Sequence, residues 1–205
     1  MIFRKFEPND RDEVRRICMD TAKGRFAVKP VLREIVANMF IDYNIDFEPQ
    51  NCIIAYDGEV CGYCAYGTDL DLLKKQTDEV YAPRVSKKNF IYAQFLKTCV
   101  KTSVKLGKKY KGGGFHLNVA KSSQGKSVGP KLLTLMGLHL RNLGYKFMYL
   151  VTENRKTRGY GFYRNFGFEE AEKCGLGTLC LIFDLSLIDE KIKKYNLEEY
   201  KYKEW

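Results

Sequence analysis

The 205-residue sequence has no uncharged apolar run of about 18 residues, so it predicts no helix that spans a membrane. Its first seven residues carry no apolar signal region. It also contains no internal repeat and no low-complexity linker that would divide it. We therefore expect one globular, cytoplasmic domain that is long enough to bury a sizeable core.

The seven cysteines show no pattern of pairing, because their number is odd and they are scattered along the chain. A disulfide framework of the kind found in small secreted proteins is therefore not expected. Cys61 and Cys64 form a C-x-x-C pair, but no second pair and no histidine cluster lies near them. The pair also falls inside an expected strand, where positions three apart face opposite sides. We accordingly expect no metal site and no redox role.

The glycines lack the spacing of the common nucleotide-binding loops, which need G-x-G-x-x-G or G-x-x-x-x-G-K-[ST]. What the sequence does contain is a turn from Gly125 to Gly129, between a strand and a helix. Residues 115–120 alternate like a half-buried strand. Pro130 suits the first turn of the helix, and Gly144 suits the position that ends it. The apolar stripe of this helix comprises Leu132, Leu133, Leu135, Met136, Leu140 and Leu143.

This turn predicts an anion-binding site. The unpaired N–H groups and the positive dipole end of the helix meet there. Gly125 and Gly129 remove side chains where a phosphate would approach the backbone, and Lys126 adds a cation. The arrangement favours a diphosphate as the ligand. For this stretch alone, the alternative is a strand–helix connection with ordinary capping and no ligand.

A second stretch, residues 161–168, has the pattern of a helix end followed by a strand. Phe162 is expected to pack inward, and Gly167 to take the left-handed turn that ends the helix. Tyr163 lies one position further round the helix and is expected to face the cleft beside the strand of residues 115–120. A buried aromatic pair at a helix end would give the same pattern if this stretch stood alone.

Together the two stretches resemble motifs of the GNAT superfamily of N-acetyltransferases. Gln124 and Gly129 match its acetyl-CoA loop, [QR]-x-x-G-x-[GA], in which Ser127 stands where a middle glycine is usual. Residues 161–168 resemble its signature F-Y-x-x-x-G-F, and the two motifs occur in order, with a helix and a strand between them. Residues 43–62 and the insert before the central strand resemble the subgroup related to the acetyltransferase-like domain of O-GlcNAcase.

The resemblance implies a GNAT fold of the α/β (α+β) class, with a mixed, mostly antiparallel central sheet and helices on both faces. Residues 1–187 are expected to form the acetyltransferase domain, with a helical insert at about residues 69–114. Residues 188–205 form a C-terminal tail that is expected as a docked helix or a dimer contact. The expected strands are residues 2–6, 52–56, 60–67, 115–120, 146–151, 168–173 and 178–185. The expected helices are residues 10–22, 30–40, 69–79, 89–106, 130–143 and 157–166.

The insert has the least regular pattern. Residues 69–79 predict a short helix, which Pro83 is expected to interrupt. Residues 89–106 predict a longer helix, in which Phe90 and Phe95 are available for burial. The substrate acceptor is expected to be selected here and in the two helices after the first strand.

The resemblance also implies a cofactor site and one catalytic residue. The backbone of Leu117, Asn118 and Val119 is expected to pair with the pantetheine arm of acetyl-CoA. Tyr163 is expected to protonate the sulfur of the leaving CoA. The diphosphate is expected to bind the loop of Gln124, Gly125, Lys126, Ser127, Val128 and Gly129.

Two parts of the site stay open. The family usually places an asparagine on the pantetheine, seven residues before the tyrosine. Lys156 occupies that position, and Asn154 lies two residues earlier. The strand alternation points His116 away from the face of Leu117. The candidate general bases are His116, Asp69, Glu153 and Tyr66.

The predicted function is transfer of an acetyl group from acetyl-CoA to a primary amine, by direct attack and without a metal. A protein lysine, a polyamine, an aminoglycoside, an amino sugar and an amino acid all remain open as acceptors. Ser127 and Lys156 motivate the alternative, a binding module of the same fold that holds acetyl-CoA without transfer. The net charge of +10 favours anionic partners, but the lysine run before Gly112 lacks the aromatics and motifs of a nucleic-acid binder. A homodimer is also open.

Overall fold

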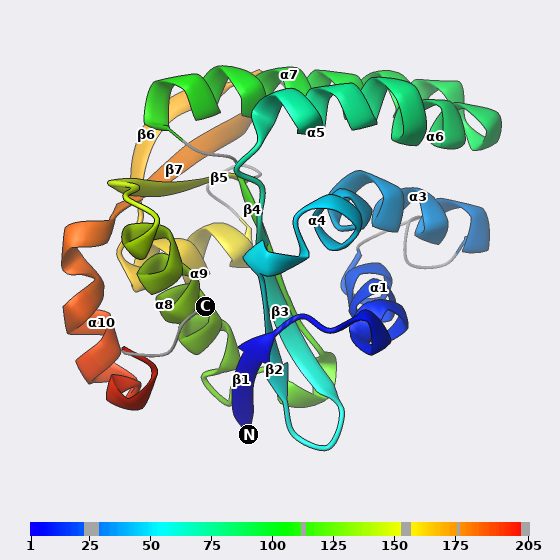
Figure 1. Cartoon of the computed structure of the whole chain (residues 1–205). Helices are drawn as coiled ribbons and strands as arrows, with labels where there is room; N and C mark the ends of the chain where they lie inside the picture. The colour runs from blue at the N-terminus through cyan, green and yellow to red at the C-terminus, as the bar shows by residue number, and fades with distance from the viewer. Residues whose placement is uncertain (23–28, 112–113, 153–156, 176, 202–205) are drawn as a thin grey trace.

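The computed structural model describes residues 1–22, 29–111, 114–152, 157–175 and 177–201 (Figure 1). Its strands form two antiparallel sheets, one with the order β1-β2-β3-β4 and one with the order β5-β7-β6. This arrangement, with helices on both faces, confirms the predicted fold class. The strands are β1 (Ile2–Lys5), β2 (Cys52–Tyr56), β3 (Val60–Tyr66), β4 (Phe115–Val119), β5 (Phe147–Thr152), β6 (Glu169–Cys174) and β7 (Thr178–Asp184).

Nine helices of the described residues surround the sheets. Those on one face of the first sheet are α1, α3 and α4, and those on the other are α8 and α10 (Figure 1). No helix in the described ranges combines the length and apolar character that crossing a membrane requires. The helices are α1 (Arg11–Asp20), α3 (Pro30–Phe40), α4 (Asp42–Phe47), α5 (Leu70–Gln76), α6 (Ala82–Lys88), α7 (Phe90–Tyr110), α8 (Val128–Asn142), α9 (Arg158–Phe166) and α10 (Ile188–Lys194).

The two sheets are joined at a single point between β4 and β5. A parallel bridge pairs Gly114 with Tyr149, and no further pairing of β4 with β5 occurs among the described residues. The two strands therefore diverge beyond this bridge. Phe115 is buried, whereas residues 116–119 of β4 are half-buried. Beyond the bridge, this edge of β4 has no partner strand among the described residues.

The central strands β2 and β3 are covered on both faces. Ile53 and Cys64 belong to the core cluster beneath α8, while Ile54 and Tyr63 belong to the cluster beneath α1 and α3. Cys61 also lies in the cluster beneath α8. The expectation that Cys61 and Cys64 face opposite sides is therefore wrong. The register of β2 against β3 shifts beside Cys61, and a bulge of this kind interrupts the alternation of side chains.

Helix α8 provides the largest part of the core. The predicted stripe is buried from Leu132 to Leu140, but Leu143 is exposed because it follows the last helical residue. Gly144 ends the helix with a φ of +88°, as predicted. Along its outer face, a Cβ on Gly137 would lie 2.5 Å from Ile188 of α10. A glycine here lets the C-terminal helix pack directly on α8.

The insert forms a helical layer along one end of the molecule, shown at the top of Figure 1. Pro83 does not interrupt the helical path, contrary to expectation. It lies in the first turn of α6, where its missing N–H costs little, and a π-helical turn over Thr77–Tyr81 precedes it. Phe90 and Phe95 are exposed, at 66% and 40%, rather than buried. The insert packs instead through a separate cluster of buried residues, of which Tyr81 is one.

Candidate active site

The open edge of β4 carries backbone groups with no partner strand. The N–H of Ala120 donates to the carbonyl of Cys61 in β3 at 2.8 Å. In an antiparallel pair, the backbone groups of successive residues point to opposite edges. The backbone groups of Asn118 therefore point to β3, as those of Ala120 do. The backbone groups of Leu117 and Val119 point instead to the divergence between β4 and β5. This edge can pair with an extended ligand as with an added strand.

A short loop carries the chain from this edge to the N-terminus of α8. The side-chain amide of Gln124 donates to the carbonyl of Val119 at 3.1 Å and so ties the loop to the strand. Gly125 and Ser127 both have positive φ, at +83° and +60°. Ser127 is the N-cap of α8, yet its side chain makes no capping hydrogen bond. The first N–H groups of α8 therefore remain available to an anion.

Gly129 allows a close approach between two helices. A Cβ at this position would lie 3.2 Å from Cζ of Phe162 and 3.7 Å from Cγ2 of Val119. The space that the missing side chain leaves is thus occupied by the Phe162 ring of α9. At Gly125, in contrast, a Cβ would meet nothing within 4 Å, and the exposed Lys126 follows it. The open part of the loop is therefore its first half.

Helix α9 places Tyr163 beside β4. The helix begins after Thr157, whose hydroxyl accepts the N–H of Tyr160 at 3.2 Å, and ends at Gly167 with a φ of +119°. The Tyr163 ring lies edge-on to Phe115 of β4, with centroids 5.8 Å apart. It is held on its other sides by the rings of Phe162 and Phe168.

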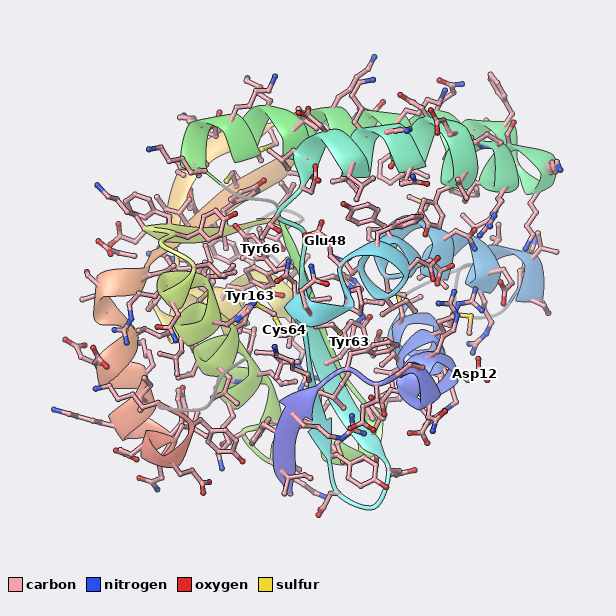
Figure 2. All side chains as sticks on the ribbon, in the orientation of Figure 1. Asp12, Glu48, Tyr63, Cys64, Tyr66 and Tyr163 are labelled. Carbon is pink, nitrogen blue, oxygen red and sulfur yellow. The ribbon has the colours of Figure 1, made fainter. Side chains whose placement is uncertain are left out.

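The hydroxyl of Tyr163 keeps its proton at neutral pH. Burial, together with the nearby Cys64 thiol, raises the pKa of Tyr163 above its usual range (Figure 2). No hydrogen bond to this hydroxyl is found within the described ranges of the chain. The hydroxyl therefore keeps its proton available as a donor.

The remaining predicted residues fall into three groups. Asn154, Lys156 and Glu153 lie outside the described residues. The carboxylate of Asp69 accepts the N–H of Leu72 at 2.8 Å and caps α5, so a helix terminus already engages it. Tyr66 is fully buried in β3, and its hydroxyl has no partner among the residues described.

His116 lies on the face of β4 opposite to the side chain of Leu117, as the alternation predicts. Its imidazole stacks on Phe40 of α3 and lies 3.0 Å from the hydroxyl of Tyr63. Burial lowers the pKa of His116 to about 4, so the ring is neutral near pH 7. It therefore belongs to the α1 and α3 side of the sheet, whereas Tyr163 belongs to the α8 and α9 side.

A buried carboxylate that the sequence pattern did not single out shapes the end of β3. Glu48 is 2% exposed and accepts hydrogen bonds from the Tyr43 hydroxyl at 2.7 Å, the Asn51 amide at 2.9 Å and the Thr68 N–H at 2.7 Å (Figure 2). These bonds hold the segment after α4 against the point where β3 leaves the sheet. The Glu48-Pro49 dipeptide indicates an interruption of regular secondary structure, but nothing in it predicts these hydrogen bonds of Glu48.

Comparison with known proteins gives a family and a fold. A family model described as the acetyltransferase (GNAT) family matches residues 13–168. The crystal structure of SsHAT matches with a TM-score of 0.77 and 18% identity over 90% of this chain and 98% of that chain. PH1933 from Pyrococcus horikoshii OT3 gives a TM-score of 0.60 and 16% identity over 89% of this chain and 97% of its own.

A third similar structure is that of a Drosophila melanogaster polyamine N-acetyltransferase that forms N-acetylagmatine. Its TM-score is 0.58, with 11% identity over 89% of this chain and 99% of that chain. At these identities the likeness to solved structures establishes the fold alone. No curated protein sequence matches the chain.

Proposed function

Because this chain belongs to the acetyltransferase (GNAT) family, we propose that it transfers an acetyl group from acetyl-CoA to a primary amine. Members of this family generally use acetyl-CoA. The observation that carries the proposal is that the open edge of β4 runs directly into the uncapped N-terminus of α8. An amide-bearing arm and a diphosphate, joined in one molecule, match that pair of features.

We assign the cofactor contacts from this geometry. The N–H and C=O groups of Leu117 and the N–H of Val119 pair with the pantetheine amides, because these groups face the divergence, whereas the carbonyl of Val119 already accepts the Gln124 amide. Asn118 points its backbone to β3 and contributes by holding the strand. The loop of Gln124, Gly125, Lys126, Ser127, Val128 and Gly129 binds the diphosphate. We keep Asn154 and Lys156 as proposed contacts to the pantetheine.

Acetyl-CoA supplies a thioester whose carbonyl carbon forms a C–N bond with the amine as its C–S bond breaks. The N–H of Leu117 or Val119 donates to the carbonyl oxygen, where negative charge develops. The attacking nitrogen releases a proton to solvent as the C–N bond forms, while Tyr163 donates its hydroxyl proton to the departing sulfur and regains a proton from solvent. The raised pKa of Tyr163 keeps it protonated for this step.

A specific observation favours a second candidate. Ser127 takes the place of a usual glycine, and the Phe162 ring fills the space over Gly129. Each feature takes open glycine backbone away from the loop. A module that binds acetyl-CoA without transferring its acetyl group would tolerate them, and the resemblance to the subgroup related to O-GlcNAcase is compatible with this alternative.

Thermal unfolding with acetyl-CoA, CoA and 3′-dephospho-CoA, followed by thiol release with a panel of primary amines, tests both candidates. A ligand at 100 times its Kd adds about 2.7 kcal/mol to the free energy of unfolding, which corresponds to a Tm shift of roughly 5–10 °C. A shift together with amine-dependent thiol release supports transfer. A shift without release beyond hydrolysis favours the binding module, and no shift contradicts both.

A further inference from the structure

Helix α7 exposes large apolar side chains at the corner where it follows α6. Phe90 and Ile91, the first two residues of α7, are 66% and 74% exposed, and Phe95 is 40% exposed. Ile91 and Phe95 are one helical turn apart, so the three side chains form one apolar patch at the start of α7. Single exposed apolar residues are common, but a contiguous patch marks an interaction surface.

The packing of α7 holds this apolar patch outward. Leu96 and Val100 are buried in the core cluster that α7 shares with α3 and α6. Helical periodicity therefore places the patch on the other side of α7, which lies at the outer edge of the helical layer (Figure 1). The side chain of Asn89 accepts the N–H of Tyr92 at 3.3 Å and caps the helix, so its first turn is fixed.

The two helices beside the apolar patch are basic. Neither α6 nor α7 contains an aspartate or a glutamate, whereas α6 contains three lysine or arginine residues and α7 contains five. These helices thus carry eight positive charges in a chain whose net charge is +10. Lys87 and Lys88 are exposed and come just before the patch. The exposed surface is therefore apolar at its centre and cationic around it.

Three lysines of α7 are not engaged by the protein itself. Nζ of Lys109 lies 2.7 Å from the carboxylate of Glu172. Lys101, Lys105 and Lys108, in contrast, are exposed and make no ion pair with the residues that the structure describes. They are spaced by four and three residues, so they share one side of α7. These charges remain available to an anionic partner.

This combination matches the surface of an anionic bilayer. Its headgroups attract lysine side chains, and phenylalanine and isoleucine side chains enter the boundary beneath the headgroups. A second copy of this chain fits less well, because a twofold contact would bring the same positive charges together. A nucleic acid would use aromatic rings that stack on bases, but Ile91, the most exposed residue of the apolar patch, has no ring.

We propose that α6 and α7 dock this protein on a membrane surface that contains anionic phospholipids. The apolar patch enters the boundary between headgroups and acyl chains. Lys101, Lys105 and Lys108 contact the phosphate and carboxylate groups of the lipids. Such docking is peripheral and requires no helix that spans the bilayer.

The first test is sedimentation of the full chain with vesicles of two compositions. One is phosphatidylcholine with phosphatidylserine at a ratio of about two to one, and the other is phosphatidylcholine alone. We expect at least about tenfold tighter binding to the mixed vesicles, because only they attract the lysines. The binding should weaken as salt rises from about 0.1 to about 1 M. Equal binding to both vesicles, or none to either, would overturn the proposal.

The second test removes the apolar patch. Phe90→Ser combined with Ile91→Ser should lower the affinity for the mixed vesicles at least about tenfold, since two large side chains no longer leave water. The matched control replaces Leu143 and Leu187 by serine, because these leucines are 54% and 44% exposed on other elements. The control should bind as the native chain does. Equal losses in the two variants would contradict docking through α7.

The third test removes charge from α7. Lys101→Gln, Lys105→Gln and Lys108→Gln together should lower the affinity about fivefold for each lysine. The matched control removes the same charge from other elements and should bind nearly as the native chain does. Its exposed lysines are Lys146, Lys173 and Lys193. Equal losses in the two variants would mean that net charge, rather than this face, attracts the vesicles, and the proposal would fail.

Two further outcomes would assign the surface to another partner and overturn the proposal. One is binding of a short DNA or RNA duplex, lost in the triple lysine variant, without binding of vesicles. The other is a dimer in analytical ultracentrifugation that the Phe90→Ser and Ile91→Ser variant dissociates. None of these measurements requires acetyl transfer, so the result is independent of the proposed function.

Discussion

Tyr163 holds its hydroxyl proton because three aromatic rings and the Cys64 thiol surround it. The same rings fix its position, so the hydroxyl has little freedom to move away from β4. Substitution by phenylalanine removes one oxygen and leaves the packing in place. The residue is therefore suited to a test that separates proton donation from cofactor binding.

We expect Tyr163→Phe to lower kcat by about 100-fold, with little change in the Kd of acetyl-CoA. Tyr160→Phe on the same helix is the control, since it removes a hydroxyl that donates to Glu170 and leaves Tyr163 in place. Steady-state kinetics and calorimetry on both variants provide the measurement. Because the pKa of Tyr163 is raised, native turnover should not decline from its ionisation up to a pH of about 10. Equal kcat in native and Tyr163→Phe chains would exclude this tyrosine as the acid.

Ser127 adopts a left-handed backbone conformation that residues with a side chain rarely take. Replacement by glycine removes this strain, which costs an L-residue roughly 1–2 kcal/mol, but adds entropy to the unfolded chain. We expect Ser127→Gly to raise the free energy of unfolding by up to about 1 kcal/mol and to bind acetyl-CoA more tightly. Urea unfolding and calorimetry measure both. Weaker binding would show that the hydroxyl itself contacts the cofactor.

At the scale of elements, local patterns predict those parts of the chain whose neighbours are close in sequence. The alternation of residues 115–120 and the stripe from Leu132 to Leu140 predicted β4 and α8 correctly. The bulge at Cys61 and the π-helical turn before Pro83 were missed, because each depends on packing against distant residues. The Glu48 network was missed for the same reason, since its donors come from segments that only the fold brings together.

The predicted site likewise divides into parts that local patterns predict and parts that depend on contacts between distant residues. The loop before α8 and the helix of Tyr163 could be placed from their glycines and their helical spacing. The direction of the backbone groups along β4 could not be predicted, because it depends on the register with β3. The hydrogen bonds of His116 also required the neighbouring strand. The sequence could therefore place the predicted cofactor loop and the helix of Tyr163 better than the surroundings of His116.

The contact between α8 and α10 gives a prediction at this scale. We expect Gly137→Val to lower the free energy of unfolding by about 1–3 kcal/mol, because its side chain would overlap Ile188 in a packed interior. Gly161→Val is the matched control, since a Cβ there would meet nothing within 4 Å. It should remain within about 0.5 kcal/mol of the native chain. Urea unfolding compares the two, and equal effects would show that α10 does not pack closely in solution.

For the whole molecule, the two histidines set the response to acid. Burial lowers the pKa of each to about 4, whereas an unfolded chain protonates histidine near 6.5. The unfolded state therefore binds more protons between these values, and the free energy of unfolding falls as pH drops from about 6.5 to 4. Because the pKa of each histidine is lowered to about 4, the two should contribute similar parts.

We expect Tm to decrease steadily over this interval in calorimetric scans, and His139→Gln to flatten the decrease. The glutamine side chain does not titrate, so its contribution is the same at every pH. Parallel curves for native and variant chains would contradict the shifted pKa of His139. A steeper loss below pH 4 belongs to the carboxylates, such as Asp189, whose pKa is lowered to about 2 by Arg141 and Lys201.

The divergence of β4 and β5 also bears on how the empty protein behaves. An unpaired strand edge is a template for another chain, and natural sheets usually cover or shorten such edges. Here the N–H groups of Leu117 and Val119 have no backbone partner among the described residues. If acetyl-CoA completes the sheet, it acts as a removable protective strand. The protein's resistance to aggregation would then vary with the supply of its own cosubstrate.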